Sequence, residues 1–289
     1  MRPMTNSCPK CGAASPDLLD VLPDQRRRLS CRRCDHVWVD GEAQPMPTSR
    51  PGSSRPVRSY ADTKAGFPTP DQVDPRRLAR VETLKTRFLS EHPTPEPRVA
   101  HFWATYQQVF SQDGLEQPDP EALHYFANSP VGAYAGQMTV FNNEWKEIGA
   151  QEGARRVAES INHLLFGPAD EHLEDRLTYL LQPGCPIGMK GWKEALLTKV
   201  LCIVEPNRFL PIVTYASPDV GKRALADLIW GLHLPETDRT SMTRGRLIFW
   251  SNDLLLALAG DGFAHAEHAS SFLWWGRDFG AELAGTPDH

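Results

Sequence analysis

Four of the six cysteines form two pairs of the C-x2-C type, Cys8 with Cys11 and Cys31 with Cys34. Each pair can form a tight knuckle that presents two thiolates to one ion, and the 19 residues between the pairs form a hairpin that brings the knuckles together. Four thiolates complete the tetrahedral shell of Zn2+ and leave no position for water, so the expected ion is structural. About forty residues cannot bury enough apolar surface to fold alone, and the metal is expected to supply the missing stability.

The residues around these pairs resemble a known family. Residues 28–38 read R-L-S-C-R-R-C-D-H-V-W and the first pair reads C-P-K-C-G. Both are similar to the short prokaryotic zinc-ribbon family, whose second knuckle has the spacing C-x-x-C-x-x-x-W. The resemblance covers residues 8–38 and implies a zinc-bound β-hairpin, but no particular partner, because that family is appended to many proteins. Gly12 is expected in a knuckle turn, Trp38 over the metal site, and His36 beside the ligands.

The net charge of −5 conceals an asymmetry along the chain. Residues 1–60 hold ten Lys and Arg against six Asp and Glu, a balance of +4, whereas the remaining residues hold 21 against 30, a balance of −9. Attraction to phosphate is therefore expected at the N-terminus. The candidate nucleic-acid contacts there are the arginines around the second knuckle, Arg26, Arg27, Arg28, Arg32 and Arg33. An equally simple interpretation is a solvated hairpin tip whose arginines are balanced by nearby aspartates.

The chain after the ribbon divides into a linker and a larger domain. Residues 41–75 are rich in Pro, Ser and Arg and are expected to form a disordered, extended linker. Residues 76–289 predict a mainly helical globular domain, and the best short strand candidate within it is 209–214. The fold class is therefore α+β, with a small β zinc ribbon at residues 1–40. The apolar stripes predict helices over residues 76–92, 99–110, 120–127, 153–166, 173–181, 192–204, 222–232, 246–258 and 265–275.

A turn containing two glycines leads into the predicted helix 192–204. Gly188 and Gly191 permit close approach of a ligand, and the free amides of a first helical turn can accept a phosphate. Lys190 and Lys193 would add positive charge, so both are candidate nucleic-acid contacts. Helix-hairpin-helix modules bind DNA backbones in this way, although their usual spacing is G-x-G rather than the G-x-x-G found here. A structural turn between two packed helices is the alternative that the pattern favours.

Strings in the C-terminal part resemble a second family. The turn segment together with L-I-F-W-S-N-D-L-L and S-S-F-L-W-W is similar to a helical domain of bacterial restriction-like proteins, over about residues 125–279. This resemblance implies no catalytic residue. Trp250, Trp274 and Trp275 are either a base-stacking surface or members of a helical core, and burial in a core is the more common outcome.

A search for catalytic groups finds fragments only. Asp219 and Lys222 resemble part of a nuclease site, but no acidic partner precedes them on a recognisable strand. His265 and His268 are spaced to meet on one helical face, without further identifiable metal ligands. Asn252 is either a polar site residue or a local cap. The sequence has no Walker A loop, no G-x-S-x-G and no H-E-x-x-H.

These observations lead to three functional hypotheses. The first is a zinc-binding, non-catalytic accessory protein that associates with DNA or RNA, in a restriction or defence setting. The second is an adaptor whose zinc ribbon docks a protein partner, and the third is a nuclease or other hydrolase whose site the sequence does not reveal. No apolar run reaches about 18 residues and no secretory signal is recognisable, so a cytoplasmic protein without membrane contact is expected.

Overall fold

The structure, a computed structural model, describes residues 8–12, 17–21, 27–31, 34, 36–40, 59–94 and 98–284. The chain divides into two compact units, residues 1–57 (the ribbon unit) and residues 58–289 (the helical unit). The ribbon unit contains the strands β1 (Asp17–Val21), β2 (Arg27–Ser30) and β3 (Val37–Asp40). The helical unit contains α1 (Tyr60–Ala65), η1 (Pro70–Gln72), α2 (Pro75–Glu91), α3 (Arg98–Val109), α4 (Gln112–Glu116), α5 (Pro120–Asn128), α6 (Thr139–Ile148), α7 (Ala150–Phe166), α8 (Leu173–Leu181), α9 (Glu194–Val204), α10 (Lys222–Trp230), α11 (Arg244–Ala259), α12 (Ala266–Arg277) and α13 (Gly280–Ala284).

The ribbon unit contains a three-stranded antiparallel sheet in the order β1-β2-β3. Leu29, in the central strand, is buried and pairs with Leu18 on one side and Trp38 on the other. Strand β2 leads directly into Cys31, so the hairpin positions the second knuckle. A small sheet beside a helical unit agrees with the predicted mixture of α and β structure.

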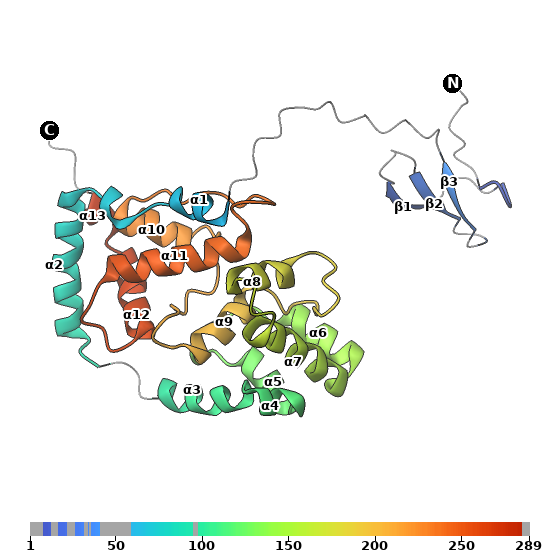
Figure 1. The fold of residues 1–289 in the computed structure, drawn as a ribbon, viewed down its shortest axis with the longest axis horizontal. Coiled ribbons are helices and arrows are strands. Elements are labelled where there is room, and N and C mark those ends of the chain that lie inside the picture. The colour runs from blue at the N-terminus through green and yellow to red at the C-terminus, as the bar shows by residue number, and fades with distance from the viewer. Residues whose placement is uncertain are drawn as a thin grey trace, which may run out of the picture. The chain divides into compact units, whose positions relative to one another are not determined.

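The helical unit consists of two groups of helices (Figure 1). In one group α11 packs against α8, α10 and α12, while α2 packs against α10, α12 and α13. In the other group α7 packs against α4, α5, α6 and α9, and α3 packs against α9. Helix α8 contacts both α7 and α11 and therefore joins the groups around one continuous apolar core. None of the described helices is both long enough and apolar enough to cross a membrane.

Each helix predicted from an apolar stripe is present, with small shifts at the ends. The predicted helix 192–204, expected to be central, begins at Glu194, and eight of its 11 residues are buried. Helices α1, α4, α6 and α13 were not predicted. Two of these have five residues and α1 has six, too short to show a repeating stripe. Helix α6 contains two adjacent asparagines and an exposed Val140, which weaken its pattern.

The strand predicted at 209–214 is wrong. The segment is buried, with Phe209, Leu210 and Ile212 at 1% exposure or less, but it pairs with no described strand. Its apolar, β-branched composition reflects burial rather than a sheet, because side chains of three neighbouring helices bond its backbone instead of a second strand.

The prediction of a disordered linker is also wrong for its C-terminal part. Residues 59–74 contain α1 and η1 and pack on the helical unit, whereas residues 41–58 lie outside the described residues. The phenol of Tyr60 stacks on His172 at 4.3 Å between ring centroids, donates to Glu174 and accepts from the indole N–H of Trp250 at 3.2 Å. Phe67 and Val73 are buried in the core. The contacts of Tyr60, Phe67 and Val73 therefore order this segment, although most residues around them are polar.

These anchors predict that the helical unit begins before residue 60. A fragment of residues 58–289 should unfold at a higher urea concentration than a fragment of residues 76–289. Its free energy of unfolding should be larger by several kcal/mol. The shorter fragment loses two buried apolar side chains, each worth about 1.5–3 kcal/mol, and uncovers their neighbours. The longer fragment with Tyr60→Phe should have a urea midpoint between those of the two fragments, because the aromatic ring stays and the hydrogen bonds of the hydroxyl are lost. Equal urea midpoints for the two fragments would show that residues 58–75 do not belong to this core.

Candidate metal centre

Four sulfur atoms lie together in the ribbon unit. The Sγ atoms of Cys8, Cys11, Cys31 and Cys34 all lie within 4.8 Å of one another. Within the described residues, no other three His, Cys, Asp or Glu side chains bring their ligand atoms together as a possible metal site. The two knuckles identified from their spacing therefore do meet, and they form one four-thiol group.

The distances within this group fit a tetrahedral ion. The Sγ atoms of Cys8 and Cys34 are 3.7 Å apart, and those of Cys11 and Cys31 are 3.5 Å apart. Four Zn–S bonds of about 2.3 Å at tetrahedral angles would separate the sulfurs by about 3.8 Å. The four cysteines are free thiols rather than disulfides. The donor set and its spacing thus fit Zn2+.

Backbone hydrogen bonds shape the first knuckle. The backbone N–H of Lys10 donates to the Cys8 sulfur at 3.4 Å, and that of Gly12 donates to the Cys8 carbonyl at 2.9 Å. Gly12 has a φ of 71°, as expected for a knuckle turn that requires the left-handed region. In the second knuckle, the N–H of Cys31 donates to the carbonyl of His36 at 3.0 Å. Both knuckles are therefore closed by their own backbone.

The thiols are crowded enough to affect ionisation. Cys8 and Cys31 are each only 2% exposed, while Cys11 and Cys34 are half-buried. The backbone hydrogen bond from His36 lowers the pKa of the Cys34 thiol, but burial and the hydrogen bonds from the other three thiols outweigh it and raise that pKa to about 12. A bound cation reverses this preference, because coordination to zinc deprotonates a thiol outright.

The strand after the second knuckle has two different faces. Trp38 is half-buried, lies opposite the buried Leu29 in the register, and stacks on His36 at 6.0 Å between centroids. On the other face Val37 and Val39 are 49% and 43% exposed. The expected place of Trp38 over the metal site stays a prediction, and the two exposed valines were not singled out in the sequence.

The arginines of the second knuckle are described only in part. Arg27 and Arg28 lie in β2, and the register places Asp40 opposite Arg27 and Asp20 opposite Arg28. The remaining candidates, Arg26, Arg32 and Arg33, lie outside the described residues.

The turn before α9 has a packing reason for one glycine. Gly191 has a φ of 79°, and a Cβ there would lie 2.4 Å from the backbone nitrogen of Phe141 in α6. Lys190 is exposed and pairs with Glu144 at 3.1 Å, and the hydrogen bond to that carboxylate raises the pKa of Lys190. Lys193 is exposed. A phosphate contact at these lysines stays a prediction.

Three polar side chains hold the irregular segment after α9. Asn252 accepts from the backbone N–H of Leu210 at 2.9 Å and donates to the carbonyl of Arg208 at 2.7 Å. Lys222 donates to the carbonyl of Ile212 at 2.6 Å, and Glu194 accepts from the N–H of Tyr215 at 2.6 Å. Asn252 therefore bonds a distant backbone segment rather than capping its own helix. Lys222 is fully buried while Asp219 is exposed, so the two do not form a nuclease-like pair.

The two histidines of α12 also bond the backbone. His268 is 4% exposed; its Nδ1 accepts from the N–H of Ala264 at 3.3 Å and its Nε2 lies 2.9 Å from the carbonyl of His92. His265 caps α12 by accepting from the N–H of His268 at 3.2 Å, and burial lowers its pKa. These contacts occupy both ring nitrogens of His268 and the Nδ1 of His265, and neither histidine belongs to a possible metal-binding group within the described residues.

The three candidate tryptophans do not form a shared cage. Trp250 is 2% exposed and packs edge-on against Phe67 at 5.7 Å between centroids. Trp275 is half-buried and packs on Phe279 at 4.6 Å. Trp274 is half-buried in a different environment, below the guanidinium of Arg277. Core packing thus accounts for Trp250, and Trp274 remains accessible.

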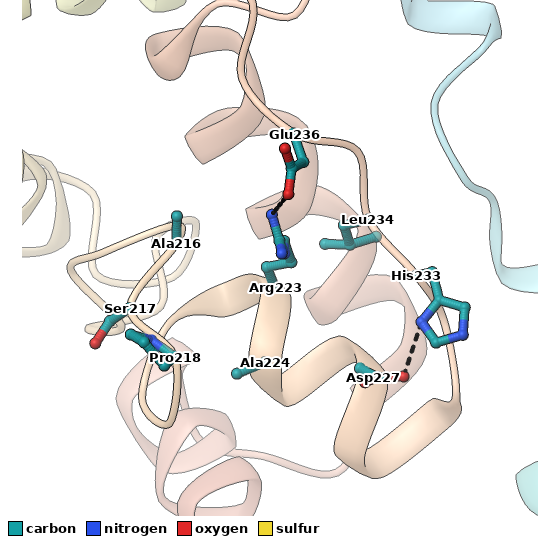
Figure 2. A pocket seen from close by; sticks show the side chains of 9 residues that line it. All are labelled: Ala216, Ser217, Pro218, Arg223, Ala224, Asp227, His233, Leu234 and Glu236. Carbon is teal, nitrogen blue, oxygen red and sulfur yellow. Dashed lines mark hydrogen bonds and ion pairs between the residues drawn. The ribbon is translucent and has the colours of Figure 1, made fainter.

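A surface pocket of about 450 Å³ lies along α10, and sequence patterns gave no signal for it. Arg223 pairs with Glu236 at 3.2 Å and Asp227 pairs with His233 at 3.0 Å (Figure 2). Figure 2 places Ser217 at the opposite end of the pocket from His233, so these side chains do not form a relay for a nucleophile. Its charged lining is largely exposed and internally paired, and it identifies no ligand.

Comparison with known proteins adds no relative: no family model, curated protein or solved structure matches this chain. The resemblances to zinc ribbons and to restriction-like helical domains therefore rest on the residues that suggested them.

The burial of Lys222 predicts a specific pH dependence of stability. Burial lowers the pKa of Lys222 from 10.5 to about 8. Between these pH values the unfolded chain binds more protons at this group than the folded chain, so the free energy of unfolding rises with pH across this window. The contribution is full above pH 10.5 and is lost as the pH falls through 8.

Urea unfolding of the wild type and of Lys222→Met, measured from pH 7 to 11, isolates this contribution, because all other titrations are shared. The stability difference between the two proteins should change by about 3 kcal/mol in favour of the wild type as the pH rises. A difference that stays constant over the whole range would mean that Lys222 is not buried.

Proposed function

We propose that this chain is a non-catalytic adaptor, in which Zn2+ bound by Cys8, Cys11, Cys31 and Cys34 holds a ribbon that docks a protein partner through β3. The observation that carries this proposal is the exposed apolar face of β3. Val37 and Val39 lie on the same side of the strand and are 49% and 43% exposed. In the sheet that the structure describes, β3 is an edge strand.

An exposed edge strand is a recurrent docking element. Its outer backbone N–H and carbonyl groups can pair with an incoming strand, and its side chains supply selectivity. An edge strand with exposed valines can pair with other chains and aggregate. A partner that covers the valines removes this risk. The metal supports this role by fixing the strand without a large core.

Association with nucleic acid is the second candidate. It is favoured by the balance of +4 in residues 1–60 and by the five arginines near the second knuckle. Two observations weigh against it: the register sets Asp20 and Asp40 opposite Arg28 and Arg27, and residues 61–289 carry a balance of −9. No comparison supports a restriction setting, and no observation favours the hydrolase alternative.

The role of the metal leads to the first test. Purified protein should contain one Zn2+ per chain, because four thiolates complete its coordination. Replacing Cys31 and Cys34 together by serine should reduce the zinc content to near zero, whereas replacing the isolated Cys185 and Cys202 by alanine should leave it unchanged. Zinc that persists after the double serine substitution would refute this ligand set.

The exposed valines lead to the second test. Val37→Lys combined with Val39→Lys should retain zinc, because both side chains are exposed and neither belongs to the four-thiol group, and should abolish docking of the partner. The test is proximity labelling in the host cells, with the labelling enzyme fused to the full chain. The wild type should label proteins that the double-lysine variant no longer labels. Val140→Lys, at a valine of the helical unit that is 60% exposed, is the matched control.

Two outcomes of this comparison decide between the candidates. Identical labelled sets for all three proteins would contradict docking through β3. Retention of DNA or RNA that weakens steeply with salt, and that is lost when Arg26, Arg27, Arg28, Arg32 and Arg33 become glutamine, would instead favour association with nucleic acid.

A further inference from the structure

A groove on the helical unit lies outside every site described above. It is formed by residues 130–134, the first residues of α3, Pro211 and one face of α12, and it has a volume of about 410 Å³. That volume falls in the range of established binding pockets. Tyr134, which is 68% exposed, and Trp274 supply aromatic surface on its walls.

Three hydrogen-bonding groups in this groove are unused. Ser270 is only 2% exposed, yet within the described residues nothing bonds its hydroxyl. The indole N–H of Trp274 and the phenol of Tyr134 likewise have no partner among the described residues, and neither atom is sealed from solvent. The Ser270 hydroxyl likewise keeps some contact with solvent, so all three groups can donate to a ligand that enters the groove.

The wall that carries Tyr134 is held in place by the core. The buried Lys199 donates to the carbonyls of Phe126 and Ser129, at 2.8 and 2.5 Å. Gly132 has a φ of 78°, and a Cβ there would lie 2.5 Å from the Ile203 side chain, so this backbone lies directly against α9. The groove is therefore largely formed before a ligand arrives, which lowers the entropic cost of binding.

The rest of the groove narrows the class of ligand. Its apolar lining includes Pro130, Val131 and Pro211, and its charged side chains are one cation, Arg98, and one anion, Glu267. Aromatic rings beside N–H and O–H donors suit a ligand with compact apolar rings and unbonded carbonyls. A proline-rich segment in the polyproline II conformation has both, because it forms no internal hydrogen bonds.

We propose that this groove binds a proline-rich peptide of a partner protein, with Tyr134 and Trp274 packing on its prolines and the hydroxyl of Ser270 and the indole N–H of Trp274 donating to its carbonyls. A nucleobase could also stack on these rings, but the balance of −9 in residues 61–289 repels its phosphates. This site is independent of the ribbon, so its failure would leave the proposed function of β3 unaffected.

The test is a fluorescence anisotropy titration of the full chain against a labelled peptide of about ten prolines preceded by one arginine. A glycine-serine peptide of the same length and charge and an oligothymidine of about ten nucleotides are the comparison probes. The proline peptide should bind, and Tyr134→Ala should lower the affinity for this peptide about tenfold. Trp274→Phe keeps a ring but removes the N–H, and should weaken it about fivefold.

Tyr125→Ala is the matched control, because Tyr125 is 60% exposed on α5 and does not line the groove. It should leave the affinity unchanged. Absence of binding by the proline peptide, equal binding of the glycine-serine peptide, or equal loss in Tyr125→Ala would overturn the proposal. Binding of the oligothymidine alone, with loss in Tyr134→Ala, would also overturn it and assign the groove to bases.

Discussion

The convergence of four thiols is the constraint on which the ribbon depends. Cys8 and Cys31 are buried, and Leu29 is the one other buried hydrophobic residue among those residues of the ribbon unit whose burial the structure describes. So small a core does not offset the entropy of ordering a hairpin and two knuckles. A tetrahedral ion bonded to all four sulfurs would link both knuckles at once, and β2 and β3 flank the second one. In the proposed function, the metal rather than a second layer would hold the strand whose exposed valines face a partner.

The helical unit shows a different use of polar groups in a core. A buried segment without regular secondary structure would leave backbone groups without hydrogen bonds, which is unfavourable. Here Asn252, Lys222 and Glu194 reach that segment from three helices and bond its backbone. Lys199 does the same for the segment that leads to the groove. Residues that resemble catalytic candidates in the sequence are therefore part of the architecture.

The limits of sequence reasoning follow from the range of each interaction. Long helices and the metal ligands were predictable, because an apolar stripe or a C-x2-C pair is a local pattern. The buried segment at 209–214 was not, because its partners lie on helices far along the chain. Gly191 looked like part of a ligand-binding turn, and only its contact with Phe141 shows why a side chain does not fit. Tyr134 and Ser270 share a groove only after folding, so no spacing pattern connects them.

The two binding surfaces proposed here require different conditions. The groove depends on the helical core alone, whereas the β3 face depends on the coordination of one ion. X-ray absorption at the zinc edge of the purified full chain examines that coordination directly. Coordination by Cys8, Cys11, Cys31 and Cys34 would give a first shell of four sulfur atoms at about 2.3 Å. Nitrogen or oxygen ligands at about 2.0–2.1 Å in place of any sulfur, or a protein that purifies folded without zinc, would contradict it.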